Sequence, residues 1–91
     1  MVWVVIMKSE YLDQLLAEII SESQRGKVEL ESFLRGILTP TELDQVVKRL
    51  QIVKSLKKGK SQRSIAESLD VGIATVTRGS RELSRGRFGH V

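Results

Sequence analysis

The feature that most constrains this fold is a helical spacing of apolar residues that recurs in three successive stretches. In a helix with 3.6 residues per turn, apolar residues three and four positions apart form one stripe along one face. The stripes consist of Leu12, Leu15, Leu16, Ile19 and Ile20; of Leu30, Phe33, Leu34, Ile37 and Leu38; and of Leu43, Val46, Val47, Leu50, Val53 and Leu56. One proline and 4% aromatic residues also favour an all-α fold over a β-sandwich.

The interruptions between the stripes set the ends of the first three predicted helices. The first helix is expected over Lys8–Ser23, before the break at residues 24–27, and the second follows around its own stripe. Pro40 suits the first position of the third helix because a helix needs no N–H donor there. Residues 57–59, Lys-Lys-Gly, end that helix with cations at the negative end of its dipole and a glycine to turn the chain.

Two shorter helices are expected after this glycine. Ser61 can cap a fourth helix over residues 62–69, residues 70–72 form a turn, and a fifth helix runs over about 73–84. Two short helices joined by a three-residue turn are the helix-turn-helix arrangement, although a plain hairpin in a helical bundle has the same spacing. The inward residues of this pair would be Ile65, Ala66, Leu69, Val71 and Val76.

Both ends of the chain lack a helical stripe. Residues 1–7, MVWVVIM, are far shorter than the roughly 20 residues that span a bilayer, and no basic segment precedes them. We expect them to be an apolar extension that is disordered or not native, with a docked arm as the alternative. Residues 85–91 are expected to form a flexible tail, which leaves one domain over 8–84. Without a targeting signal, we expect a cytoplasmic protein with no membrane partner.

The composition excludes several classes of functional site. The chain has 91 residues, no cysteine and one histidine, His90, so a cysteine or histidine metal site and a Ser-His-Asp triad are not expected. No nucleophile has a base at a plausible spacing, and the carboxylates do not pair on a pocket-like face. We therefore expect neither an enzyme, nor a metal site, nor a cofactor.

The charge is divided unevenly along the chain. Residues 1–45 hold four basic and eight acidic side chains, whereas residues 46–91 hold eleven basic and three acidic ones. A basic half beside an acidic half favours a polyanion as partner of the basic half. A solvated lysine-rich surface, or a helical interaction module with no nucleic acid, is the alternative that salt-dependent DNA binding would exclude.

The basic charge and the helix-turn-helix together predict binding to double-stranded DNA. The N-terminal end of the fifth helix would enter the major groove, and the start of the fourth helix would lie at the phosphates. The candidate DNA-binding residues are Lys60, Gln62, Arg63, Gly72, Ile73, Ala74, Thr75, Thr77 and Arg78. Gly72 is expected to permit a close approach at the entry to the fifth helix.

One stretch after the predicted turn is especially specific, because residues 72–80 read GIATVTRGS. A general helix-turn-helix regulator has no physical need for Thr-Arg-Gly-Ser at this point. Together with Leu38-Thr39-Pro40, Arg49, Ile52-Val53 and Ser61-Gln62-Arg63, this stretch resembles the bacterial Trp repressor family over about residues 38–83. The resemblance implies an intertwined homodimer in which residues 8–59 form dimerisation helices and residues 61–84 the DNA-binding helix pair.

The resemblance also implies a transcriptional repressor that uses L-tryptophan as corepressor. The indole would lie between Arg49 and Arg78 from different subunits, and Arg78 would also hold the ligand carboxylate. Thr39 of the partner subunit would assist that carboxylate, and the carbonyl of Leu38 would accept from the ligand ammonium. The implied corepressor-binding residues are Leu38, Thr39, Arg49, Thr75, Arg78, Gly79 and Glu82.

Two departures from the family pattern leave an alternative open. The family has a further helix after the recognition helix, where this chain has residues 85–91, and Glu82 stands where well-known members have a small hydroxyl residue. This carboxylate could pair with the ligand ammonium, or it could repel the ligand carboxylate and remove the site. The alternative is a DNA-binding regulator of the same fold with a different effector or none.

Overall fold

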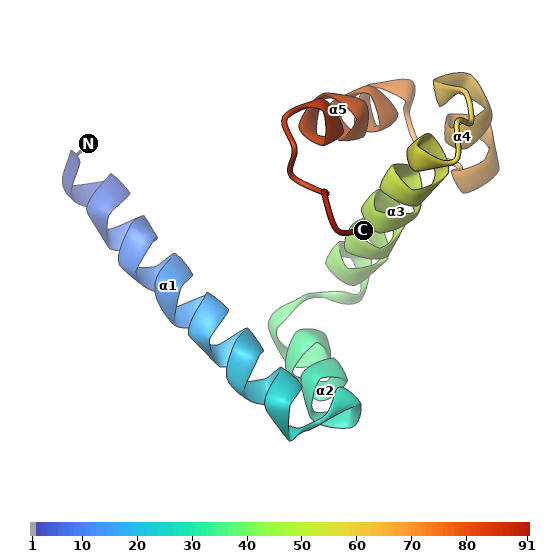
Figure 1. Cartoon of the computed structure of the whole chain (residues 1–91). Helices are drawn as coiled ribbons and strands as arrows, with labels where there is room; N and C mark the ends of the chain where they lie inside the picture. The colour runs from blue at the N-terminus through green and yellow to red at the C-terminus, as the bar shows by residue number, and fades with distance from the viewer. Residues whose placement is uncertain (1) are drawn as a thin grey trace. The chain divides into compact units, whose positions relative to one another are not determined.

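The computed structural model describes residues 2–91, with side chains from residue 9 onward. Within that range the chain forms five α-helices and no strand, which confirms the predicted all-α class (Figure 1). The helices are α1 (Val2–Arg25), α2 (Lys27–Ile37), α3 (Pro40–Lys57), α4 (Gln62–Leu69) and α5 (Ile73–Ser84). None of these helices, over their described residues, has the length and apolar character needed to cross a bilayer.

The chain divides into two compact units, of which the first ends at Pro40. Its helices α1 and α2 contact each other and are separated only by Gly26. Helix α1 begins at Val2 rather than at the predicted Lys8, so residues 2–7, where we expected an apolar extension, are helical. No glycine or proline stands between residues 2–7 and the predicted helix, so nothing local ends the helix at Lys8. Residue 1 lies outside the described residues.

The second unit, Thr41–Val91, is built around a small apolar core. Ile52 of α3, Ile65 of α4 and Val76 of α5 are each at most 1% exposed and form one cluster. The side chains packed against this cluster are Leu56, Ala66, Leu69 and Val71. The core therefore joins all three helices, with most of its side chains from α3 and α4 and Val76 from α5.

The buried face of α3 differs from the predicted stripe. Val46, Val47 and Leu50 remain 41–51% exposed, whereas Ile52, which lies outside that stripe, is buried. Of the predicted stripe, only Val53, which is 2% exposed, and Leu56, which packs against the core cluster, lie on the buried face of α3. Periodicity alone identified α3 as amphipathic but did not identify which face this unit buries.

Helices α4 and α5 have the predicted ends, and residues 70–72 separate them as expected. Ser61 caps α4, because the backbone N–H of Ser64 donates to its hydroxyl over 3.2 Å. Across the pair, the hydroxyl of Thr77 donates to Oε1 of Gln62 over 2.7 Å. The two helices are therefore joined by a side-chain hydrogen bond as well as by the apolar core.

Helix α5 ends in a Schellman motif, a turn that closes a helix with a left-handed residue. Gly86 has a φ of 81°, which favours glycine, and its N–H donates to the carbonyl of Leu83 over 3.0 Å. The N–H of Arg87 donates to the carbonyl of Glu82 over 3.3 Å. The motif reverses the chain, and Figure 1 shows the last segment returning from α5 to α3.

The segment Arg85–Val91, where we expected a flexible tail, contacts α3 in the structure. Residues 85–90 form consecutive turns. The ammonium of Lys57, at the end of α3, donates to the carbonyl oxygen of Phe88 and, over 2.7 Å, to that of Val91. The expectation missed these contacts because they join parts of the chain about 30 residues apart.

The contact of Gly79 with Ile52 gives a test of the core. A Cβ at Gly79 would lie 2.9 Å from Cγ2 of Ile52, a buried β-branched side chain that has little freedom to move. We expect Gly79→Ala to destabilise the protein by about 1–3 kcal/mol, because overpacking outweighs alanine's better helix propensity. Urea unfolding measures the change.

Gly72→Ala is the matched control. Gly72 has an ordinary φ of −68°, and no atom of the described residues lies within 4 Å of a Cβ placed there, so these residues make no close approach to Gly72. Gly72 is the N-cap of α5, so we expect Gly72→Ala to cost about 0.5–1 kcal/mol from the poorer cap and nothing from overpacking. Equal or greater stability of Gly79→Ala relative to the unmodified protein would contradict the proposed packing.

Candidate functional site

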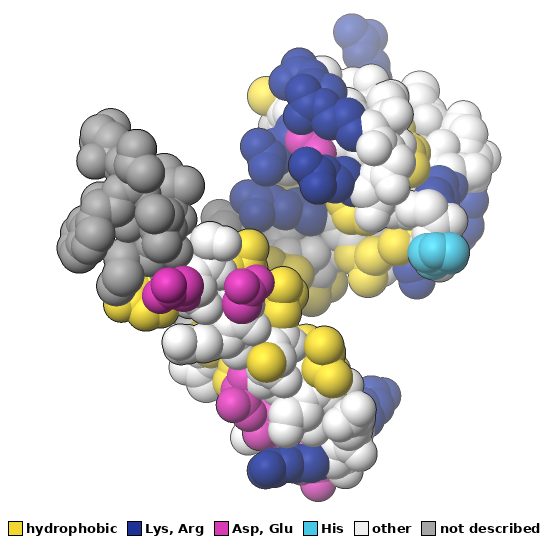
Figure 2. Space-filling view, turned by 60° about the vertical axis from the view of Figure 1, so that its left-hand side comes forward, with side chains coloured by type: hydrophobic (Ala, Val, Ile, Leu, Met, Phe, Trp, Pro, Cys, Tyr) yellow, Lys and Arg dark blue, Asp and Glu magenta, His cyan; other side chains and the backbone are white. Residues whose placement is uncertain are grey.

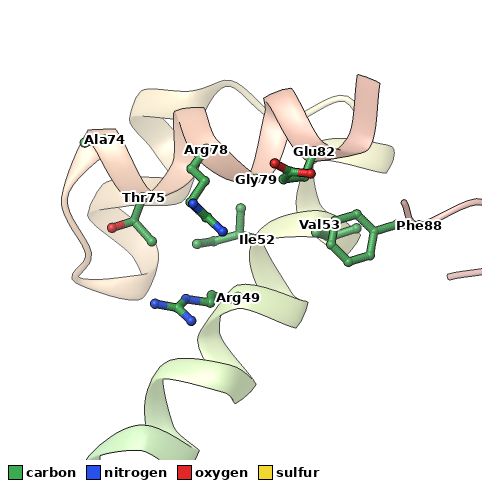
Figure 3. Close-up of a pocket in the computed structure, with 9 residues that line it drawn as sticks. All are labelled: Arg49, Ile52, Val53, Ala74, Thr75, Arg78, Gly79, Glu82 and Phe88. Carbon is green, nitrogen blue, oxygen red and sulfur yellow. The ribbon is translucent and has the colours of Figure 1, made fainter. Parts of the chain in front are cut away.

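A pocket of about 330 Å³ opens beside the core of the second unit. Residues from α3 and α5 and one residue of the following segment line it (Figure 3). They are Arg49, Ile52, Val53, Ala74, Thr75, Arg78, Gly79, Glu82 and Phe88. Small-ligand pockets typically measure about 300–1,000 Å³, so this one has room for a small organic molecule.

Two arginines stand at one side of the pocket. Figure 3 shows Arg78 extending from α5 toward α3, with Arg49 on α3 beneath it. Both side chains are exposed and positively charged, and a guanidinium can pair with a carboxylate through two parallel bonds or stack on an aromatic ring. This side of the pocket is therefore suited to an anionic or aromatic group of a ligand.

The floor of the pocket is apolar and is part of the core. Ile52 and Val53, at most 2% exposed, lie at its base, and Gly79 adds no side chain above Ile52. A ligand that filled the pocket would bury apolar surface against the side chains that hold α5 on α3. Binding here would thus act directly on the packing of α5.

Glu82 is already paired within the chain. Its Oε1 accepts from Nη1 of Arg85 over 2.9 Å and its Oε2 from Nε of Arg87 over 3.2 Å, with 20% of the side chain exposed. Partial burial raises the pKa of Glu82, but the hydrogen bond from Arg87 and the charges of Arg85, Arg87 and Arg78 outweigh it. The pKa is held below its ordinary value, so the group is a carboxylate at neutral pH.

Phe88 was missed by the sequence analysis, which placed it in a flexible tail. Phe88 is half-buried and closes the end of the pocket near Glu82 and Val53 (Figure 3). The local signal was Gly86, two residues after the end of α5, which is typical of a Schellman turn. That signal predicts a reversal of the chain but not the place to which the chain returns.

The seven expected corepressor-binding residues are divided between the two units. Five of the seven line the pocket: Arg49, Thr75, Arg78, Gly79 and Glu82. Leu38 and Thr39 belong to the first unit, where Leu38 ends α2 and its N–H donates to the carbonyl of Leu34 over 2.9 Å. Their contact with a ligand stays a prediction.

The expected DNA-binding residues lie mostly on the surface of the second unit. Gly72, Ile73 and Ala74 are exposed at the N-terminal end of α5, and Lys60 and Arg63 are exposed near the start of α4. Figure 2 shows Lys and Arg side chains gathered on this unit and acidic side chains on the first. The exposed residues and the surrounding positive charge are therefore suited to a polyanion.

Three of the residues expected to contact DNA make other contacts within the chain. Gln62 and Thr77 are half-buried and bonded to each other, so their hydrogen bond holds α4 and α5 together. Thr75 is half-buried and lines the pocket. Among the described residues, no group of three His, Cys, Asp or Glu side chains could hold a metal ion.

Comparison with known proteins gives one consistent family. The sequence model described as Trp repressor protein matches residues 10–90. A protein named Trp operon repressor homolog from Vibrio vulnificus strain YJ016 is 43% identical over 76 residues, which are 81% of this chain and 74% of the relative. The homolog of Vibrio cholerae is 50% identical over 54 residues, 58% of this chain and 52% of the relative. No solved structure gave a significant match.

The paired state of Glu82 predicts a pH dependence. Since its folded pKa lies below its unfolded value, Glu82 adds stability above the unfolded pKa, and this stability is lost as the pH falls through the folded pKa. We expect Glu82→Gln to lower the melting temperature at neutral pH and to have little effect in strong acid. Melting curves across this pH range measure the difference.

Glu67→Gln, on an exposed position of α4, is the control for loss of a carboxylate without a change at the pocket. An effect of Glu82→Gln that stays constant from neutral pH to strong acid would contradict the ion pairs with Arg85 and Arg87.

Proposed function

The chain belongs to the Trp repressor family, whose members are DNA-binding transcription regulators and not enzymes, and from this premise we propose its specific function. The protein is a sequence-specific repressor that binds operator DNA as a homodimer and uses L-tryptophan as corepressor. A DNA-binding regulator of the same fold with a different effector, or none, is the second candidate. The observation in its favour is Glu82, whose carboxylate faces the pocket.

The pocket beside α5 is the main support for a small-molecule corepressor. The resemblance implies arginines from two subunits, whereas here Arg49 and Arg78 of one chain line the same pocket from different helices, above an apolar floor. An amino acid with an aromatic ring matches this lining, because guanidinium groups bind its carboxylate and stack on its ring. Ala74 and Thr75 line the pocket close to the end of α5 that is proposed to enter the major groove.

This arrangement suggests how the ligand would control DNA binding. A ligand between α3 and α5 would select the orientations of α5 in which both helices contact it. In a dimer, two such helices must meet successive major grooves about 34 Å apart. Tryptophan would thus increase the population of the DNA-binding arrangement without forming a new fold.

The exposed apolar stripes support the homodimer. In the single chain, Leu12, Leu16 and Ile20 on α1 are 48–58% exposed. Val46 and Val47 on α3 are 46% and 51% exposed. Stripes of this length on two helices are expensive to leave in water, and a second copy of the chain would cover them. Residues 8–59 would then form the dimer and residues 61–84 the DNA-binding part.

Double-stranded DNA binding should be strongly salt-dependent. We expect Lys60→Ala and Arg63→Ala to reduce the slope of log K against log salt by about 1 for each lost phosphate contact, and to weaken all sequences alike. Ile73→Ala should instead weaken binding to duplexes that the protein selects from a random pool more than binding to unselected duplexes, because Ile73 would face base edges. Titrations at several salt concentrations measure both effects.

The same samples test the dimer. Sedimentation should give two chains for each selected duplex. Lys27→Ala, which removes a positive charge from the first unit, is the control for Lys60→Ala and Arg63→Ala. A salt-independent affinity would exclude the DNA-binding surface, and one chain per duplex would exclude the dimer.

The corepressor is tested by calorimetry with L-tryptophan. Arg78→Lys keeps the charge but loses the planar fork, so we expect tryptophan binding to weaken by about 1–3 kcal/mol. Arg49→Ala should weaken it as well, although Arg49 is on another helix. Arg81→Lys is the matched control on α5, since Arg81 does not line the pocket. No heat with millimolar L-tryptophan would reject this corepressor and leave the DNA-binding proposal intact.

A further inference from the structure

We propose that the segment Arg85–Val91, here called the strap, holds Phe88 as a specificity-determining wall of the ligand pocket. The inference rests on the proposed function of that pocket as a ligand site. It concerns residues that follow α5 and that the sequence analysis expected to be flexible. Three observations support it: the turn that starts the strap, the bonds that hold it and the position of Phe88.

The turn that starts the strap has a polar reinforcement. In a Schellman motif the residue after the left-handed glycine usually makes an apolar contact with the last turn of the helix. Here the corresponding residues are Arg87 and Glu82, and they form an ion pair of 3.2 Å. Arg85 pairs with the other carboxylate oxygen over 2.9 Å. Glu82 therefore fixes the direction in which the strap leaves α5.

The far part of the strap is bound to α3. The ammonium group of Lys57 donates to the carbonyl oxygens of both Phe88 and Val91, so it binds the strap at two residues. Bonds to a charged donor are stronger than neutral ones, but these are exposed to solvent. The strap can thus be docked in the free protein and still open to admit a ligand.

Phe88 acts as a wall and not as a plug. The pocket retains about 330 Å³ with Phe88 in place, so the ring bounds the space without filling it. Figure 3 shows the ring at the end of the pocket beside Val53 and Glu82, away from Arg49. A ligand would therefore meet cations on one side and an aromatic face at the other end. Such a lining selects a compact organic acid with a flat apolar part.

This wall also bears on the second charge of an amino-acid ligand. Both carboxylate oxygens of Glu82 are occupied by arginines of the strap. A ligand ammonium that approaches Glu82 must compete with Arg85 and Arg87. Selectivity at this end of the pocket would thus depend on the docked strap, through Phe88 for shape and through Glu82 for charge.

The strap is tested first in the protein without ligand. With labelled phenylalanine, we expect NMR cross-peaks from the Phe88 ring to methyl groups of Ile52 or Val53. Lys57→Met should remove them, because it deletes the ammonium but keeps an apolar stem, and Lys57→Arg should retain them. Lys58→Met, at the adjacent exposed lysine, is the control. Absence of the cross-peaks in the unmodified protein would overturn the docked strap.

The role in binding is tested by a double-mutant cycle with L-tryptophan. We expect Phe88→Ala to weaken binding roughly three- to tenfold and Phe88→Leu to weaken it less. Lys57→Met should weaken binding in the unmodified protein but add no further loss to Phe88→Ala, because Lys57 is a positioning residue that acts through Phe88. Additive losses, or unchanged affinity in Phe88→Ala, would overturn the proposal.

The two proposals can fail separately. Cross-peaks without any tryptophan binding would reject the corepressor, and with it the part of Phe88 in selecting that ligand, while the docked strap would stand. Tryptophan binding without cross-peaks would support the corepressor and reject the strap.

Discussion

The packing of Ile52 against Gly79 determines the geometry of the second unit. Residue 79 has no side chain, so Ile52 contacts α5 directly and is shielded from water together with Ile65 and Val76. Only a few side chains of this unit are fully buried, so little other apolar burial holds α5 in place. In a close-packed core, one added methyl group at this contact must displace a neighbour. The close approach of α5 to α3 therefore depends on Gly79, while Val76 joins α5 to the same core.

The pocket is a consequence of the same contact. Ile52 is both a core residue and the floor of the pocket, and Gly79 leaves open the space above it. The helices held by this contact place Arg49 and Arg78 on one side of the space. A ligand bound there would add apolar burial to a core that has little of its own. The stability of this unit and the proposed control of α5 would therefore both depend on the same bound molecule.

The local sequence predicted the elements of the second unit well. Ser61 as N-cap, Pro40 as first residue of α3 and the turn at residues 70–72 were all found as predicted. Hydrogen bonds within about four residues determine such features, so their signals are contiguous. The resemblance of about residues 38–83 to a known family identified five pocket residues, of which Arg49 lies on a different helix from the other four.

The sequence alone thus predicted the five helices, the N-cap of α4, the basic half and the family. The tertiary structure decided which face of α3 is buried and where the segment after α5 returns. Ile52 is one position outside the predicted stripe, and Lys57 reaches Phe88 across 31 residues of chain. Contacts of this range depend on where whole helices pack, and no short pattern encodes that position. The pocket's charged side could therefore be predicted from a motif, whereas its aromatic end required the folded chain.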